Sequence, residues 1–194
     1  MCISYSDFFS KNKAWVESVK QDNPDFFQLA SKQHNPDYLW LGCSDSRVPI
    51  NEMLGILPGE IFVHRNIANQ ANGTDMSFSA VLEYAITQLK VKHILVVGHY
   101  ACGGVSAAIN GNKNEIVNFW VQDIVKLVSD KQTHSQANMS DEEWHDYICE
   151  QNVIKQVENI NRIPLVKKAK EERGLGVAGW IYNVRDGLLH DITP

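Results

Sequence analysis

A histidine and a cysteine stand close together at His99 and Cys102, so that their side chains share one tight turn. The preceding residues 94–97 form a short, apolar and mostly β-branched run, which is typical of a strand buried on both faces. Open α/β sheets place their ligand sites at the carboxyl ends of such strands. An imidazole and a thiolate there supply half of a zinc site, so the other ligands must come from elsewhere in the chain.

A third candidate ligand, Cys43, ends a second buried-strand pattern over residues 38–43. If the two strands are parallel neighbours, their carboxyl ends meet and Cys43 converges with His99 and Cys102. Two cysteines and one histidine leave the fourth position of tetrahedral zinc open, as in a catalytic rather than a structural site. A single buried cysteine is more often a small core residue, so the inference depends on all three occurring together.

Asp45 and Arg47 lie in the polar turn that follows Cys43. Zinc can lower the pKa of a bound water from ~15.7 toward ~7, which produces hydroxide near neutral pH. A carboxylate held by the Arg47 guanidinium can accept a hydrogen bond from that hydroxide and aim it at a substrate. Gly103 and Gly104 let a backbone N–H approach the oxygen of a small substrate. In the alternative interpretation, Asp45 and Arg47 form an ion pair that only fixes the turn.

Strand and helix patterns alternate along the chain, and this alternation predicts an α/β protein with a parallel sheet. Further strands are expected over residues 61–66 and 177–182, and a turn at Asp186-Gly187 leads into residues 188–192. Helical spacing or capping signals occur over residues 6–19, 25–32, 77–89, 116–128, 140–160 and 164–173. We expect a single domain, residues 1–194, with a mostly parallel sheet of four to five strands flanked by helices. Its N-terminal helices, within residues 1–34, are expected to pack on a partner subunit.

The composition limits the classes of partner and compartment. The chain has 194 residues, 44% of them hydrophobic, and a net charge of -5, which argues against nucleic acid or an anionic membrane as the main partner. Its apolar runs fall short of the ~20 residues that a membrane helix needs. The sequence starts without a secretory signal pattern, so we expect a cytoplasmic protein whose four cysteines bind metal or stay free.

Three ordered motifs resemble those of the β-class carbonic anhydrases. They are Cys43-Ser44-Asp45-Ser46-Arg47, the segment from Glu60 to Asn69 that contains Phe62, Arg65, Asn66 and Ala68, and Gly98-His99-x-x-Cys102-Gly103-Gly104. The resemblance runs from about Trp40 to Tyr182, most of the chain. It implies reversible hydration of carbon dioxide to bicarbonate and a proton, with one zinc ion per subunit. By position, it assigns Cys43, His99 and Cys102 as zinc ligands, and Asp45 with Arg47 as the catalytic dyad.

The resemblance also implies a substrate cleft that a partner subunit completes, and hence self-association as a dimer or tetramer. Phe62 and Tyr84 match its apolar and aromatic walls, and we expect Gly103 to border the same cleft. The family's cleft glutamine corresponds either to Gln33 or, without a gap, to His34.

Trp40, Arg65 and Tyr182 match a subgroup (type II) whose members bind bicarbonate at a non-catalytic pocket. In that subgroup the residue equivalent to Asp45 leaves its arginine and becomes the fourth zinc ligand. A carboxylate competes with neutral water better than with hydroxide, so low pH should favour this closed state. Bicarbonate held by Arg65, with Trp40 and Tyr182 as donors, would then act as an allosteric inhibitor. In the alternative interpretation, the three residues are core aromatics around a structural arginine.

Two other functions fit the same residues. A hydrolase on this scaffold would act on carbonyl sulfide or carbon disulfide, and a non-catalytic zinc protein would sense bicarbonate or serve in an assembly. The remaining cysteines and histidines are expected to be free or to serve in packing: Cys2, Cys149, His64, His93, His134, His145 and His190.

Overall fold

The computed structural model describes residues 4–32, 34–135 and 139–194, which fall into two compact units, residues 1–35 and 36–194. The first unit holds α1 (Asp7–Asp22) and α2 (Phe26–Lys32), close to the two predicted helices. The rings of Trp15 and Phe27 meet edge to face within this unit, with centroids 5.7 Å apart. Its packing on a partner subunit stays a prediction, and Gln33 lies outside the described residues.

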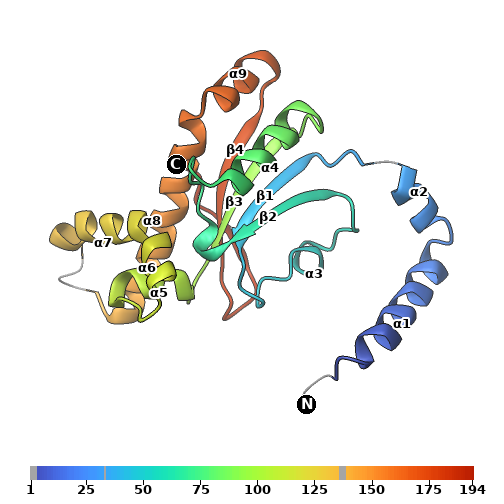
Figure 1. The fold of residues 1–194 in the computed structure, drawn as a ribbon, viewed down its shortest axis with the longest axis horizontal. Helices are drawn as coiled ribbons and strands as arrows, with labels where there is room; N and C mark the ends of the chain where they lie inside the picture. The colour runs from blue at the N-terminus through green and yellow to red at the C-terminus, as the bar shows by residue number, and fades with distance from the viewer. Residues whose placement is uncertain (1–3, 33, 136–138) are drawn as a thin grey trace. The chain divides into compact units, whose positions relative to one another are not determined.

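The second unit is built on a five-stranded sheet with the order β2-β1-β3-β4-β5 (Figure 1). Its strands are β1 (Tyr38–Cys43), β2 (Ile61–Asn66), β3 (His93–His99), β4 (Gly176–Tyr182) and β5 (Leu189–Asp191). The first four are parallel, and β5 returns antiparallel to β4. This arrangement confirms the predicted mostly parallel α/β sheet.

Helices connect the strands, and more of them pack on one face of the sheet than on the other. They are α3 (Ile50–Leu54), α4 (Met76–Thr87), α5 (Gly103–Asn110), α6 (Glu115–Trp120), α7 (Gln122–Ser135), α8 (Asp141–Arg162) and α9 (Pro164–Arg173), with a short 3-10 turn, η1 (Ile67–Asn69). Alternate β1 residues face opposite sides. Leu39 and Leu41 join the large core formed with α4, α5 and α7 to α9, whereas Trp40 joins a smaller cluster that includes Ile50 of α3.

The prediction of one continuous helix over residues 116–128 was wrong, because the segment forms two helices, α6 and α7. Its apolar residues do not share one face: Ile116 and Phe119 are 84% and 82% exposed, whereas Val121 and Ile124 are buried. Val121 leaves the helical conformation at φ -88° and ψ 9°, which ends α6 and lets α7 start in a new direction. The break turns the buried side of α7 toward the core.

Local signals fix the other helix ends. Ser140 and Glu143 form the reciprocal capping box expected at the start of α8. Pro164 occupies the first turn of α9, and Gly174 ends that helix in the left-handed conformation. Among the described residues, none of the helices combines the length and apolarity required to span a membrane.

The strand order creates a topological switch point between β1 and β3. The chain moves from β1 outward to β2, then crosses back to β3 and continues outward to β4 on the other side. Open parallel sheets bind ligands outside the carboxyl ends of strands at such a point, because the two crossovers leave a crevice there. Gly42 pairs with Val97, so the following residues, Cys43 on β1 and Gly98 with His99 on β3, reach this edge together.

A buried histidine on β2 gives the fold a testable pH dependence. His64 is 8% exposed, and its Nε2 has no hydrogen-bond partner among the described residues and lies 4.0 Å from the Asp75 carboxylate. Burial lowers the pKa of His64 from its ordinary 6.5, and Asp75 opposes this only in part. The unfolded chain therefore binds more protons, so this contribution to stability is complete above pH 6.5 and declines as the pH falls through the folded-state pKa.

We expect the substitution His64→Phe to flatten the dependence of melting temperature on pH between about pH 5 and 7. Thermal melts of both proteins across this range measure the difference in slope. The same change at exposed His190 serves as the control and should keep the slope of the parent protein. Identical slopes for the parent and His64→Phe would contradict the prediction.

Candidate metal centre

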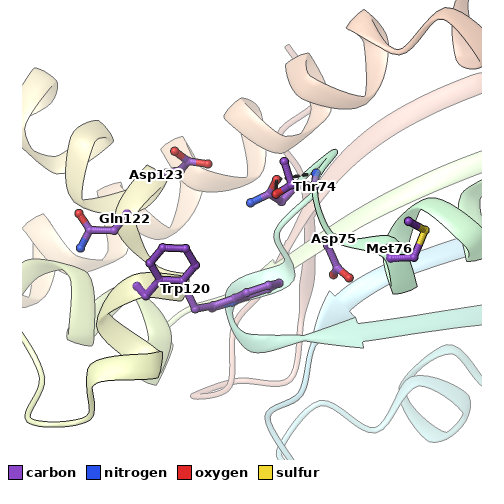
Figure 2. Close-up of a pocket in the computed structure, with 8 residues that line it drawn as sticks. Thr74, Asp75, Met76, Trp120, Gln122 and Asp123 are labelled. Carbon is purple, nitrogen blue, oxygen red and sulfur yellow. Dashed lines mark hydrogen bonds between the residues drawn. The ribbon is translucent and has the colours of Figure 1, made fainter.

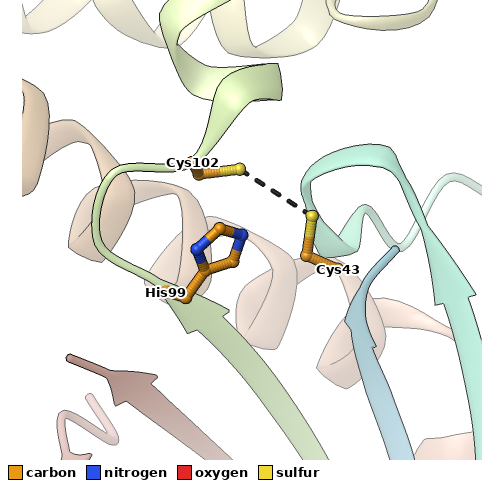
Figure 3. A group of neighbouring side chains, drawn as sticks. All are labelled: Cys43, His99 and Cys102. Carbon is orange, nitrogen blue, oxygen red and sulfur yellow. Dashed lines mark hydrogen bonds between the residues drawn. The ribbon is translucent and has the colours of Figure 1, made fainter. Parts of the chain in front are cut away.

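Three side chains converge at the switch point, as predicted. Cys43 ends β1, His99 ends β3, and Cys102 directly precedes α5. Their ligand atoms all lie within 4.8 Å of one another, and all three residues are buried (Figure 3). The two Sγ atoms are 3.9 Å apart.

The donor set fits zinc. Tetrahedral zinc with Zn–S bonds of about 2.3 Å separates two sulfur ligands by about 3.8 Å, close to the observed spacing. The Nδ1 atom of His99 lies 2.8 Å from the Tyr100 carbonyl, to which it donates as N–H, so Nε2 keeps its lone pair. That Nε2 atom is buried and has no hydrogen-bond partner among the described residues. A buried imidazole nitrogen without a partner, facing two sulfurs, is what a metal ligand requires.

The two cysteine sulfurs perturb each other's pKa. The hydrogen bond between them lowers the pKa of Cys43, as do the backbone N–H groups of Ala68 and Asp45. Because the two sulfurs compete for one proton, the pKa of Cys102 is raised. A dication bound by both sulfurs would take the place of the shared proton and stabilise both as thiolates.

Asp45 lies beside the three ligands but is held by Arg47. Its Oδ1 accepts from the backbone N–H and Nε of Arg47, each at 2.9 Å, and its Oδ2 accepts from Nη2 at 2.7 Å. Arg47 keeps the pKa of Asp45 well below its usual range, so this carboxylate is ionised. Arg47 also donates to the Ala101 carbonyl at 3.0 Å, which ties the two loops together. Asp45 Oδ2 lies 3.8 Å from the open Nε2 of His99.

A pocket of about 320 Å³ opens beside Cys43 and Asp45, and Gly103 forms part of its wall. A methyl group at Gly104 would lie 2.7 Å from Ile67 Cγ2 and 2.9 Å from Ala68 Cβ, so glycine is required there for packing. A methyl group at Gly103 would meet nothing within 4 Å, so this glycine borders open space. The sequence predicts the same role for both glycines, whereas the structure gives Gly104 a role in packing and places Gly103 at open space.

Phe62 and Tyr84 lie elsewhere in this subunit. Phe62 is the second residue of β2, near the opposite end of that strand from Asn66, which pairs with Cys43. Its ring stacks at a tilt against Tyr84 of α4, with centroids 5.8 Å apart. Their predicted place in a cleft between subunits stays a prediction.

The three residues assigned to bicarbonate binding share one face of the sheet. Trp40 belongs with Tyr182 to the smaller apolar cluster, and Arg65 follows Val63, the register partner of Trp40, on the same face of β2. Arg65 donates to the carbonyls of Cys43 and Val48 at 3.0 and 2.7 Å. The Trp40 indole N–H is fully buried without an acceptor among the described residues. Arg65 and Asp45 both line a second pocket, of about 510 Å³.

His145, which the sequence analysis did not assign to the site, contacts the loop that carries Cys102. The Nε2 atom of His145, on α8, lies 3.1 Å from the Cys102 carbonyl, and its Nδ1 lies 3.7 Å from Cys149 Sγ. Burial raises the pKa of Cys149 to about 12, so this thiol stays protonated, as expected for packing. The sequence holds no local signal for the His145 contact, because α8 reaches the loop only in the folded chain.

A further pocket, of about 390 Å³, lies between residues 72–76 and the junction of α6 with α7 (Figure 2). Its walls include Thr74, Asp75, Met76, Trp120, Gln122 and Asp123. None of the predicted site residues lines it. The Trp120 indole N–H, beside it, donates to the Ile67 carbonyl at 2.8 Å.

Comparisons with known proteins agree on one family. The family described as carbonic anhydrase matches residues 38–189. A carbonic anhydrase of Emericella nidulans is 41% identical, over 98% of this chain and 84% of the relative. A tetrameric β-carbonic anhydrase of Sordaria macrospora superposes with a TM-score of 0.93 at 35% identity, covering 97% of this chain and 96% of that one. The β-carbonic anhydrase of Coccomyxa in complex with acetazolamide gives 0.89 at 31% identity, covering 98% and 87%.

Removal of one sulfur ligand tests the metal centre directly. We expect Cys102→Ser to lose most bound zinc, because a serine hydroxyl stays protonated and is a poor zinc ligand. Metal content of purified protein, measured by atomic emission, gives the result. Cys149→Ser changes a buried thiol outside the ligand set and should keep one zinc per chain. Full zinc content in Cys102→Ser would exclude Cys102 as a ligand.

Proposed function

Since this chain belongs to the β-class carbonic anhydrase family and is itself a carbonic anhydrase, we propose that Cys43, His99 and Cys102 hold the zinc that serves carbon dioxide hydration. The observation that supports this most strongly is the unpartnered Nε2 of His99, buried and facing two sulfurs. Zinc in this donor set supplies a Lewis acid that brings the pKa of a water toward neutrality. The reaction then forms one carbon–oxygen bond between water and carbon dioxide and releases one proton.

We propose that Asp45 orients the attacking water. The carboxylate is ionised and Arg47 fixes it at three points, so it can accept a hydrogen bond from that water and restrict the direction of its lone pair. Gly103, on the wall of the adjacent pocket, leaves space for the small linear substrate. Arg47 acts through Asp45, because its guanidinium is committed to that carboxylate and to the Ala101 carbonyl.

Regulation through Asp45 follows as a second part of the proposal. Asp45 Oδ2 lies 3.8 Å from His99 Nε2, so a modest rotation away from Arg47 would make it the fourth metal ligand. A carboxylate displaces water more readily than hydroxide, so acid favours this closed state. The buried, unpaired Trp40 N–H supports a bicarbonate pocket with Arg65 and Tyr182. Bicarbonate there would draw Arg65 from the Cys43 and Val48 carbonyls and so bias the switch.

Self-association is proposed as well. The Sordaria macrospora relatives are tetrameric. The sheet of this chain ends in β2, which has the neighbour β1 on one side only. Apolar side chains on and beside it are exposed, among them Val63, Ile67 and Met76. A cytoplasmic location stays a prediction.

The role of Asp45 is testable by a nearly isosteric change. Asp45→Asn should keep zinc, because the ligands are untouched, but lose roughly 100-fold or more in kcat, because the amide presents the water with a different donor and acceptor pattern. Stopped-flow hydration assays with metal analysis measure both. Asp37→Asn, at the other end of β1 and paired with Lys92, is the matched control and should stay fully active. Full activity of Asp45→Asn with zinc bound would remove Asp45 from the mechanism.

Bicarbonate inhibition tests the regulatory pocket. Arg65→Ala should weaken inhibition of hydration by added bicarbonate, because it removes the cation that would bind the anion. Since Arg65 also supports the Cys43 and Val48 carbonyls, Tyr182→Phe provides a milder change that deletes one hydroxyl. We expect severalfold weaker inhibition in both variants, measured as the inhibition constant for bicarbonate at fixed pH. An unchanged constant in both would argue against the pocket.

A further inference from the structure

The turn that follows β2 has an unusual backbone. Ala68 and Asn69 in η1 both have positive φ, at +62° and +46°, although neither is glycine. Such residues are strained and persist only where the surroundings hold them in place. Two successive buried residues with positive φ indicate that the neighbouring metal centre requires this backbone conformation.

The turn contacts the two segments that carry Cys43 and Cys102. Asn66, just before it, accepts a hydrogen bond at its carbonyl from the backbone N–H of Ser44, the residue after Cys43. Ala68 is fully buried in the same core cluster as Cys43 and Cys102. Its Cβ occupies the space beside Gly104, in the first turn of the helix that Cys102 opens. The turn therefore sets the spacing between the end of β1 and the start of α5.

Two buried amides on α8 hold this turn from the inside. Asn152 Nδ2 donates to the Ala68 carbonyl at 3.0 Å, and Gln156 Nε2 donates to Asn152 Oδ1 at 2.8 Å. Gln156 Oε1 in turn accepts from the Ala71 backbone N–H at 2.9 Å. Asn152 and Gln156 are 1% and 3% exposed. The Ala68 carbonyl can only accept and the Ala71 N–H can only donate. These two backbone groups therefore fix the orientation of both side-chain amides.

We propose that Asn152 and Gln156 are positioning residues for the metal centre, which act by holding the left-handed turn at Ala68, where it contacts the segments of Cys43 and Cys102. The hydrogen bonds of both residues go to partners other than Cys43, His99 and Cys102 among the described residues. Their hydrogen bonds keep Ala68 in its strained conformation, and Ala68 keeps the two sulfur-bearing segments at the spacing that zinc requires. Other bonds on the outer side, from Trp120 to Ile67 and between Asn66 and Gln70, hold the turn's ends rather than Ala68 itself.

The test measures zinc affinity separately from folding. Asn152→Leu replaces the amide by an apolar group of similar size, which suits the surrounding core but cannot donate to Ala68. We expect zinc affinity, from competition with a chelator, to fall by about 10- to 100-fold, the range seen when supporting partners of metal ligands are lost. The melting temperature of the metal-free variant should stay close to that of the metal-free parent. Asn161→Leu, at a half-buried position of the same helix where the side chain accepts from Lys170, is the matched control and should bind zinc like the parent.

Gln156→Met provides a second variant, because it removes the bonds to Ala71 and Asn152 without adding charge. It should weaken zinc binding in the same direction as Asn152→Leu. Equal zinc affinity in the parent and both variants would overturn the proposal. Failure of both variants to fold without metal would assign these amides to general stability and would also overturn it.

A double substitution tests the path through the turn. Glycine adopts positive φ without strain, so Ala68→Gly should restore part of the zinc affinity lost in Asn152→Leu. Simple additivity of the two changes would show that Asn152 does not act through Ala68, and would overturn the proposal. The inference rests on the metal site of the proposed function, but the two fail differently. A parent protein without zinc would refute the proposed function, whereas equal zinc affinity in parent and variants would refute only this inference.

Discussion

Parallel pairing of β1 with β3 is the constraint on which the site depends. It brings together the ends of two strands that are distant in the sequence, and it places Cys43 and His99 at the one edge where the crossovers diverge. The remaining contacts at the site refine this placement. Arg47 joins the loop after β1 to the loop after β3 through the Ala101 carbonyl, and Arg65 joins β2 to the Cys43 carbonyl. A shift in the β1–β3 register would move Cys43 away from His99, even if the contacts of Arg47 and Arg65 were kept.

Much of this site could be predicted because its signals are local. A buried strand pattern that ends in Cys43, and another that leads to His99 and Cys102, fix which residues lie at the sheet edge once the strands are taken as parallel neighbours. The pairing of Asp45 with Arg47 is also local, since they are two positions apart. The capping box at Ser140 and Glu143 could be found for the same reason.

Other features depend on the folded chain and left no readable pattern. Asn152 contacts Ala68 across 84 positions, and an asparagine within a helix resembles many solvent-facing asparagines. The left-handed turn at Ala68 carries no glycine that would announce it. The break at Val121 was missed because apolar residues on two different faces were counted as one. The predicted place of Phe62 and Tyr84 in a cleft between subunits would depend on a second copy of the chain, and it stays a prediction.

The two halves of the site face different surroundings. The His99 side chain is 0% exposed, whereas the Arg47 side chain that holds Asp45 is 52% exposed. Mobile ions screen exposed charges over a Debye length of about 8 Å at physiological ionic strength, but buried ligands are screened much less. Dissolved ions therefore have access to Arg47, which anchors the Asp45 carboxylate, and little access to Cys43, His99 and Cys102. The Arg47–Asp45 contact of 2.7 Å is much shorter than the Debye length, so salt weakens it only in part. The ion pair that orients Asp45 is thus more accessible to the ions of the solvent than the three buried side chains beside it.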